Sequence, residues 1–341
     1  MSRRALGIAG AAGGRLALAG VLDAVGTGGT VDIGATAGLA VSRKWLAPGA
    51  GGTVPIIGAA LSGIVARAGG VIADLAGQAV GVVDAPTGPA NGRTVIFHHG
   101  GYYYSWYWED QIRALSEVGY RVIAKDRLGW GKSSKPDIPY SINLWASNTA
   151  RLMDHLGIEQ AALVGHSIGG QMVTRFAFLY PERITHLVTV NQVGLTDRRG
   201  GRGFQPLTGE VDANPDRDAV YASLLRWADG NYVKWRPDYL EHMRIRYGQR
   251  LSGDWPRMAY ISRITGHMRS MDTVVNDWHH IETPTLILGG QEDYPTYAEE
   301  ARTAASTFPN GEVILIPNVG HNPHEEAPDR VNAELIRFLG D

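Results

Sequence analysis

The sequence predicts an α/β protein whose main domain contains a doubly wound, mostly parallel β-sheet. From residue 93 onward, short apolar runs rich in β-branched residues alternate with longer amphipathic stretches, as strands and helices do in such a sheet. Glycine-rich or polar loops follow the ends of these apolar runs, where parallel sheets place their ligands. A chain of 341 residues has room for one large domain and an appendage.

Local patterns predict the elements of this domain one by one. The expected strands are residues 94–97, 121–124, 161–164, 185–190, 285–288 and 313–316. The clearest helices are residues 111–118, 142–156 and 169–179, the second of which ends at the C-cap candidate Gly157. Residues 78–84 could add an antiparallel strand before the first of these elements.

Residues 1–90 form a different kind of sequence, dominated by glycine and alanine, and we expect a mainly helical extension there. Gly63, Gly70 and Gly77 recur every seven residues, a spacing that lets helices approach closely in membranes. Internal charges and the frequent glycines favour packing on the main domain over a membrane span. Contact with a membrane through this extension remains an alternative.

The first residues raise the question of targeting. Arginines at positions 3 and 4 precede a weakly apolar stretch, a pattern typical of twin-arginine or secretory leaders. Arg15 interrupts that stretch early. We therefore favour a cytoplasmic protein over an exported or peripherally membrane-bound one.

Composition excludes several classes of protein. The chain is 44% hydrophobic and 19% charged, as globular proteins are, and its net charge of −2 gives no reason to expect a nucleic-acid partner. The chain has no cysteine, which excludes disulfides, thiolate metal sites and a cysteine nucleophile. We find no metal-binding cluster, phosphate loop or dinucleotide motif in a convincing context, so no cofactor is expected.

Residues 165–169 read Gly-His-Ser-Ile-Gly and fit the pattern G-x-S-x-G. They stand where the apolar run 161–164 gives way to a helical pattern. A serine on such a sharp strand-to-helix turn is pushed out of the sheet, and flanking glycines are needed because side chains would collide with neighbouring backbone. Ser167 is therefore a candidate nucleophile, provided that a base and an acid accompany it.

A carboxylate and a histidine follow two later strands. Asp293 lies in the loop after the fifth expected strand and His321 in the loop after the sixth. Acyl transfer by serine needs a base that takes the hydroxyl proton and a carboxylate that orients this base. The chain order serine, acid, histidine is the order associated with a strand-turn-helix nucleophile. Three residues compete for these roles, namely Glu292 and Asp197 for the acid and His324 for the histidine.

Residues 93–340 resemble the α/β-hydrolase fold family. The motifs that carry the resemblance are His99-Gly100, residues 126–133, the Ser167 turn, residues 290–293 and Gly320-His321. The resemblance implies that Ser167 is the nucleophile, His321 the general base and acid, and Asp293 the carboxylate that orients His321. It also implies an oxyanion hole formed by the N–H groups of Ile168 and Gly101, with Tyr102 as an alternative second donor.

The resemblance implies an organisation in which residues 1–90 are the extension and residues 91–341 the hydrolase domain, with a helical cap inserted at about 194–280. Candidates for the substrate pocket are His99, Tyr102, Trp106 and His166, although His166 is expected mainly to pack. The cap region combines aromatic residues such as Trp227 with arginines such as Arg244, Arg246 and Arg263. This composition suits a small apolar or aromatic acyl substrate that carries a carboxylate, or simply a cap with its own core.

Within this family, epoxide hydrolases and haloalkane dehalogenases place aspartate at the position of Ser167, so the resemblance argues against both activities. It implies hydrolysis of a carboxylic ester, thioester or lactone through an acyl-enzyme. Hydrolysis of a carbon-carbon bond in a meta-cleavage-type diketone by the same three residues is an alternative, and haloperoxidase or perhydrolase activity a weaker one. A non-catalytic small-molecule binding protein on the same scaffold is an alternative of another class.

Overall fold

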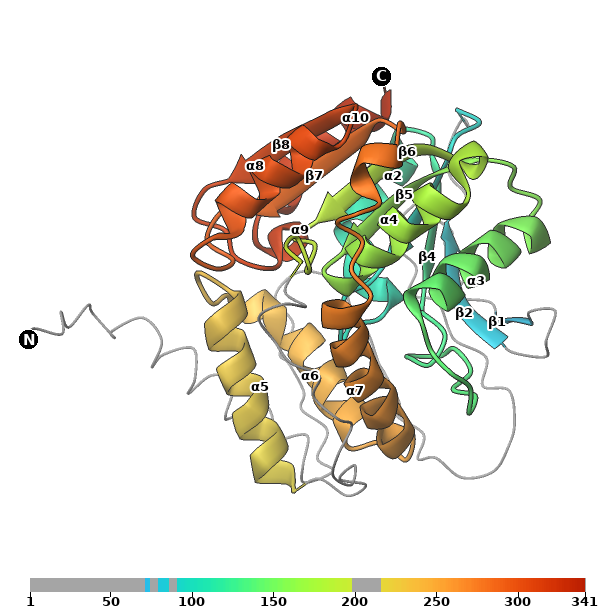
Figure 1. The fold of residues 1–341 in the computed structure, drawn as a ribbon. Helices are drawn as coiled ribbons and strands as arrows, with labels where there is room; N and C mark the ends of the chain where they lie inside the picture. Colours follow the sequence, from blue (N-terminus) through green and yellow to red (C-terminus); the bar gives the residue numbers. More distant parts are fainter. Residues whose placement is uncertain (1–70, 74–78, 86–90, 198–215, 341) are drawn as a thin grey trace, which may run out of the picture.

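The structure, a computed structural model that describes residues 71–73, 79–85, 91–197 and 216–340, confirms the predicted fold class (Figure 1). One sheet has the strand order β1-β2-β4-β3-β5-β6-β7-β8, and β3 to β8 are all parallel. The strands are β1 (Val71–Ala73), β2 (Ala79–Ala85), β3 (Thr94–His98), β4 (Arg121–Lys125), β5 (Ala161–His166), β6 (Ile184–Val190), β7 (Thr285–Gly290) and β8 (Gly311–Ile316).

Helices cover both faces of this sheet. They are η1 (Ser105–Trp108), α2 (Glu109–Glu117), α3 (Ile142–His155), α4 (Ile168–Leu179), η2 (Pro181–Arg183), α5 (Arg217–Asn231), η3 (Pro237–Tyr239), α6 (Leu240–Arg250), α7 (Trp255–Met271), η4 (Trp278–His280), α8 (Tyr297–Thr307), α9 (Pro323–Glu326) and α10 (Pro328–Gly340). The three helices expected near residues 111–118, 142–156 and 169–179 are α2, α3 and α4.

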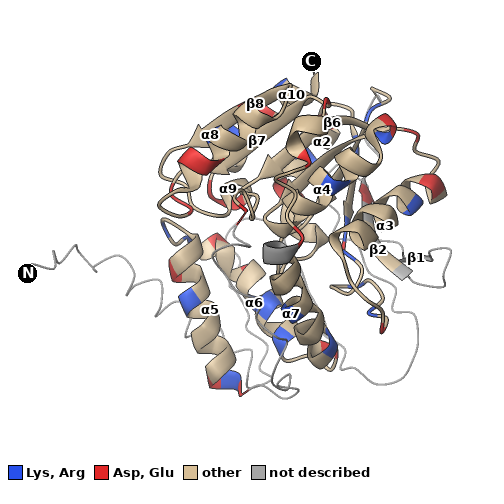
Figure 2. Cartoon of the chain, in the orientation of Figure 1, with Lys and Arg blue, Asp and Glu red and all other residues tan. Residues whose placement is uncertain are grey.

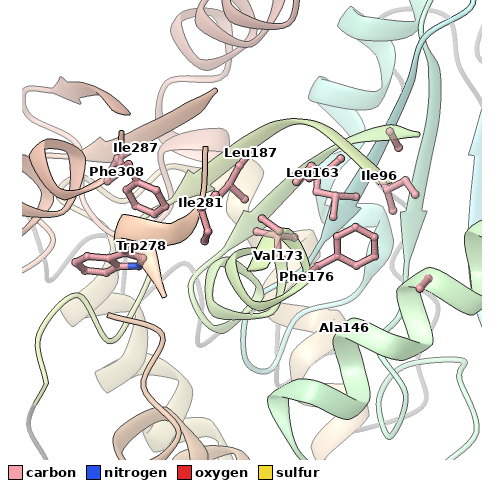
Figure 3. Packing of buried hydrophobic residues seen from close by; sticks show 14 of the residues in the cluster. Ile96, Ala146, Leu163, Val173, Phe176, Leu187, Trp278, Ile281, Ile287 and Phe308 are labelled. Carbon is pink, nitrogen blue, oxygen red and sulfur yellow. The ribbon is translucent and has the colours of Figure 1, made fainter. Parts of the chain in front are cut away.

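The alternation of side chains along each strand divides the core into two layers. In β3, Ile96 packs with α3, α4 and α8 on one face, whereas Val95 and Phe97 pack with α2 and α10 on the other. Figure 3 shows Val173 and Phe176 of α4 in the first of these layers. Because both faces are covered, the strands read as continuous apolar runs, which is why the sequence revealed them.

Within residues 1–90 the structure describes only 71–73 and 79–85, which are strands and not the expected helix, and the antiparallel strand expected at 78–84 is confirmed as β2. Residues 71–73 and 79–85 form strands β1 and β2, and β2 pairs antiparallel with β4. The valines of β2 favour a strand, because β-branched side chains pack well in a sheet. Asp84 of β2 also forms an ion pair with Arg121 of β4 at 2.7 Å. The sheet therefore begins earlier than residue 91. The heptad glycines Gly63, Gly70 and Gly77, together with the arginines near the N-terminus, lie outside the described residues.

The insertion between β6 and β7 contains the cap helices α5, α6 and α7, which lie together beside one end of the sheet (Figure 1). Helices α5 and α6 share an apolar cluster of their own. Of the expected cap aromatics, Tyr232, Tyr239 and Tyr247 are buried in this cluster, whereas Trp278 belongs to the main core. No helix in the described part of the chain is both long and apolar enough to cross a lipid bilayer.

Candidate active site

Ser167 lies on the turn between β5 and α4 in a strained backbone conformation, with φ 55° and ψ −119°. Hydrogen bonds fix this conformation, because Ser167 N–H donates to the Val190 carbonyl at 3.0 Å and its own carbonyl accepts from Gly170 N–H at 3.0 Å. A Cβ at Gly165 would stand 2.3 Å from the Gly169 carbonyl oxygen. The turn can therefore form only with glycine beneath the serine.

Asp293 and His321 meet although 27 residues lie between them in the chain. His321 Nδ1 lies 2.8 Å from Asp293 Oδ2, and both side chains are largely buried. Because a carboxylate accepts hydrogen bonds, Nδ1 carries the hydrogen, and a neutral imidazole then keeps Nε2 free to accept a proton. The strands β7 and β8 are neighbours, which explains why their following loops come together.

Asn191 follows β6 and holds the acid loop in place. Its Nδ2 donates to Asp293 Oδ2 at 2.9 Å, and its Oδ1 accepts from Gly290 N–H at 2.8 Å. The residue has a positive φ of 40°, which asparagine tolerates better than most side chains. Asn191 was not singled out from the sequence, although a polar residue directly after an apolar strand was a usable signal.

The loop after β3 is held by hydrogen bonds to its main chain. His99 Nδ1 donates to the Gly100 carbonyl at 2.7 Å, and His99 Nε2 accepts from the Arg127 N–H at 3.0 Å. Burial, followed by the charge of Arg127, lowers the pKa of His99 well below its usual range, so the ring is neutral. The Gly100 N–H donates to Tyr107 Oη at 3.1 Å.

This loop passes directly over the serine turn. A Cβ at Gly100 would lie 2.6 Å from His166 Nδ1 and 3.1 Å from Ser167 Cβ, so only glycine allows the approach. The Gly100 N–H is thus engaged with Tyr107, and the Gly101 N–H is the next one along the loop. The Ile168 N–H opens α4, where helical N–H groups have no intrahelical partner.

The loop that carries His321 is attached to the cap. His321 N–H donates to the Asn231 carbonyl at 3.0 Å, at the C-terminal end of α5. Glu326 accepts from Gly320 N–H at 3.0 Å through Oε1 and from Val233 N–H at 3.0 Å through Oε2. Burial raises the pKa of Glu326 to about 7. The same loop is also attached to the serine turn, because the His321 carbonyl accepts a hydrogen bond from His166 Nε2 at 2.8 Å.

The competing acids and histidine take other places. Glu292 accepts from the Val319 N–H at 3.1 Å, and Asp197 is exposed. His324 is buried, and burial lowers its pKa well below the usual range. The structure thus pairs His321 with Asp293 and not with these neighbours.

A cavity of about 200 Å³ lies between the cap and the loops that follow β3 and β4. Its walls are formed by Tyr102, Trp130, Ser223, Leu224, Trp227, Arg246, Gln249, Arg250 and Trp255. Of the four expected pocket residues, Tyr102 lines this cavity. His99 uses both ring nitrogens on the main chain, Trp106 packs against the core, and His166 holds the His321 loop.

Among the described residues, no three histidine or carboxylate side chains gather closely enough to hold a metal ion. What the geometry offers is an oriented imidazole, a strained serine and main-chain donors beside it.

Curated relatives span several reactions. A non-heme haloperoxidase from Rhodococcus erythropolis is 27% identical over 73% of this chain and 93% of that protein. Epoxide hydrolase B from Mycobacterium tuberculosis is 27% identical over 76% of this chain and 94% of that protein. A bifunctional esterase/perhydrolase from Acinetobacter calcoaceticus is 25% identical over 74% and 93%, respectively. This similarity alone does not select one reaction.

Solved structures share the architecture. A probable hydrolytic enzyme from Pseudomonas aeruginosa PAO1 superimposes with a TM-score of 0.69 at 30% identity, covering 77% of this chain and 90% of that one. An esterase from Exiguobacterium antarcticum gives 0.65 at 20% identity, covering 80% and 100%, and at this identity the likeness concerns the fold alone. The profile of the Alpha/beta hydrolase family matches residues 95–334, which span every loop described above, and the chain therefore belongs to the alpha/beta hydrolase family.

Proposed function

We propose that this protein is a serine hydrolase that cleaves a carboxylic ester, thioester or lactone through an acyl-enzyme. The observation that carries the proposal is the hydrogen bond from His321 Nδ1 to Asp293, 2.8 Å long, in loops that flank a serine held in a strained turn. A serine in ordinary surroundings is a weak nucleophile, so an oriented imidazole of this kind has a clear chemical use.

In the proposed mechanism, His321 Nε2 takes the proton of the Ser167 hydroxyl as its oxygen attacks the scissile carbonyl carbon. Asp293 holds the imidazole in the required tautomer and stabilises its charged form. The Ile168 and Gly101 N–H groups donate to the carbonyl oxygen as it becomes negative. His321 then protonates the departing alcohol, and a water activated by the same imidazole releases the acid and restores Ser167.

The serine at position 167 distinguishes the proposed reaction from epoxide hydrolysis, the activity of one relative. Resemblance within the family implies that epoxide hydrolases use a carboxylate at this position, which forms an alkyl ester with the substrate. Serine instead forms an acyl ester, so we propose attack on an acyl carbon. The bifunctional esterase/perhydrolase among the relatives makes ester hydrolysis the reaction to test first.

Labelling with a fluorophosphonate tests the proposal, because the probe phosphorylates activated serines. We expect the wild-type protein to be labelled at Ser167 and the variants Ser167→Ala and His321→Ala to lose labelling. Ser306→Ala, a change at an exposed serine of α8, serves as the control and keeps it. Labelling that survives Ser167→Ala would contradict the proposal.

Turnover assays then identify the bond that is cleaved. We expect the wild-type protein to hydrolyse p-nitrophenyl esters of short acids. In Ser167→Ala we expect the rate of this hydrolysis to fall at least about 10³-fold. Turnover of a meta-cleavage dienoate without turnover of any ester would replace ester hydrolysis by carbon-carbon hydrolysis. Tight ligand binding with no turnover of either would favour a binding protein.

A further inference from the structure

The cavity beneath the cap is lined by aromatic residues and carries a net positive charge. Its nine lining residues include two arginines, Arg246 and Arg250, and no acidic residue. Each guanidinium lies over an indole ring, Arg246 over Trp227 at 3.4 Å and Arg250 over Trp255 at 4.6 Å from the ring centroid. Figure 2 shows the basic segments of α6 and α7 close together in the cap.

Arg246 is the residue on which the inference depends. It is 3% exposed, and its Nε and Nη1 have no hydrogen-bond partner among the described residues. Burial raises the pKa of the Glu325 carboxyl, and the positive charge of Arg246 lowers it less strongly. The two carboxylate oxygens of Glu325, however, contact other groups: Tyr232 Oη at 2.8 Å and His242 Nε2 at 3.4 Å. No described carboxylate forms an ion pair with Arg246.

A buried guanidinium with unsatisfied N–H groups is costly, and the attraction to aromatic faces offsets only part of that cost. Arginine presents its donors in a planar fork that matches a carboxylate. A ligand carboxylate in this cavity would therefore receive hydrogen bonds that the described residues leave unmade.

We propose that the cavity is an anion subsite in which Arg246 binds a carboxylate carried by the acyl chain of the substrate, away from the scissile carbonyl. This inference rests on the proposed hydrolase function and names its substrate class, the monoesters of small dicarboxylic acids. The apolar rings of the cavity receive the methylene or aromatic spacer between the two carbonyl groups.

The position of the cavity relative to Ser167 supports this arrangement. Tyr102 lines the cavity and stands two residues after Gly100, whose Cβ position lies 3.1 Å from Ser167 Cβ. Gly100 and Tyr102 are two Cα steps of about 3.8 Å each apart along the chain. The Arg246 guanidinium carbon lies 5.9 Å from the centroid of the Tyr102 ring, so the loop beside Ser167 and this guanidinium meet at the same cavity.

The test compares p-nitrophenyl monoesters of succinate, glutarate and adipate with neutral p-nitrophenyl esters of the same chain length. For each protein we divide kcat/KM for the carboxylate ester by kcat/KM for the neutral ester. We expect this ratio to be about 10-fold or more lower in Arg246→Met than in the wild-type protein, because hydrogen bonds to a charged group are lost. Arg246→Lys, which keeps the charge without the fork, is expected to recover part of the ratio. Use of a ratio removes any general loss of folding or of catalysis.

Arg226→Met is the matched control, since Arg226 is an exposed arginine of neighbouring α5 and the change removes the same charge. Its ratio is expected to equal that of wild type. A ratio unchanged in Arg246→Met, or lowered equally in Arg226→Met, would overturn the anion subsite.

Direct binding separates failure of the subsite from failure of the proposed reaction. Glutarate is titrated calorimetrically into Ser167→Ala with and without Arg246→Met. Glutarate binding that is lost with Arg246 supports the subsite even if no ester is turned over. The subsite is rejected if glutarate does not bind Ser167→Ala and the ester ratio is the same in the wild-type protein and in Arg246→Met. Loss of the reaction alone would reject the hydrolase assignment.

Discussion

At the scale of single residues, Asn191 is the side chain that connects the end of the sheet to Asp293 by hydrogen bonds. It connects the ends of β6 and β7 and shares the Asp293 oxygen that faces His321. Its function is to keep Asp293 in the orientation that the imidazole needs.

Asn191→Gly and Asn191→Ala are both expected to lower kcat about 10-fold on whichever ester the wild type hydrolyses, because a hydrogen bond to a charged group is lost. Only Asn191→Ala is expected to lose about 1 kcal/mol of additional stability, since φ at this position is 40° and glycine adopts that conformation freely. Steady-state kinetics and urea unfolding of the two variants measure the two effects. Unchanged kcat in both would remove Asn191 from the site.

At the scale of elements, the contact between β5 and α4 determines whether the serine turn can exist. The two elements approach so closely that a methyl group at Gly165 would meet the Gly169 carbonyl at 2.3 Å and Val173 Cγ2 at 2.7 Å. Backbone cannot move aside as the end of a flexible side chain can. The strained turn is thus maintained by the packing of the whole strand-helix pair.

Gly165→Ala is expected to lower the free energy of unfolding by about 2 kcal/mol or more, because the added methyl group overpacks this junction. Gly266→Ala on α7 is the control: nothing lies within 4 Å of its Cβ position. That variant is expected to be neutral or stabilised by up to about 1 kcal/mol, since alanine favours helix. Denaturant unfolding measures both, and equal stability of the two variants would contradict the steric argument.

At the scale of the whole molecule, the chain must return from the cap to the sheet between α7 and β7. Arg175 of α4 binds this return segment through Asp277 at 2.7 Å, Asp272 at 3.2 Å and the Thr273 carbonyl at 3.1 Å. Its side chain is 12% exposed. Arg175, on the helix that Ser167 precedes, therefore attaches the far end of the cap to the main domain.

Arg175→Met is expected to reduce the free energy of unfolding by about 3 kcal/mol, because partly buried carboxylates lose their partner. The exposed Arg151 of α3 provides the control Arg151→Met, for which a change below about 0.5 kcal/mol is expected. Denaturant unfolding at low and at high salt measures the difference. A deficit that vanished in salt would indicate a surface ion pair and contradict this description.

The sequence was sufficient for the strands of the parallel sheet, because burial on both faces leaves apolar runs that are easily seen. The positions of Ser167, Asp293 and His321 followed from the loops after those strands, and the structure brings the last two into contact. Strand β1, three residues long, was not visible in a region where glycine and alanine hide any alternation of side chains.

Other features depend on contacts between distant segments. Nothing in the local sequence of Arg246 distinguishes it from Arg244, two residues earlier. The fold buries Arg246 in the cavity, whereas Arg244 lies 3.7 Å from Glu241 on the same helix. Likewise, His99 and His166 are near the site, but their hydrogen bonds to main-chain atoms could be found only from coordinates.

The attachment of the His321 loop to Asn231 and Val233 has a consequence for protein engineering. An exchange of caps between relatives would also exchange these contacts. Here the end of α5 supplies the carbonyl that holds His321 N–H, and Val233 N–H binds the carboxylate that holds Gly320. Residues 231–233 lie within the cap, between α5 and α6, so a transplanted cap should reproduce the backbone of this segment if His321 and Gly320 are to keep their partners.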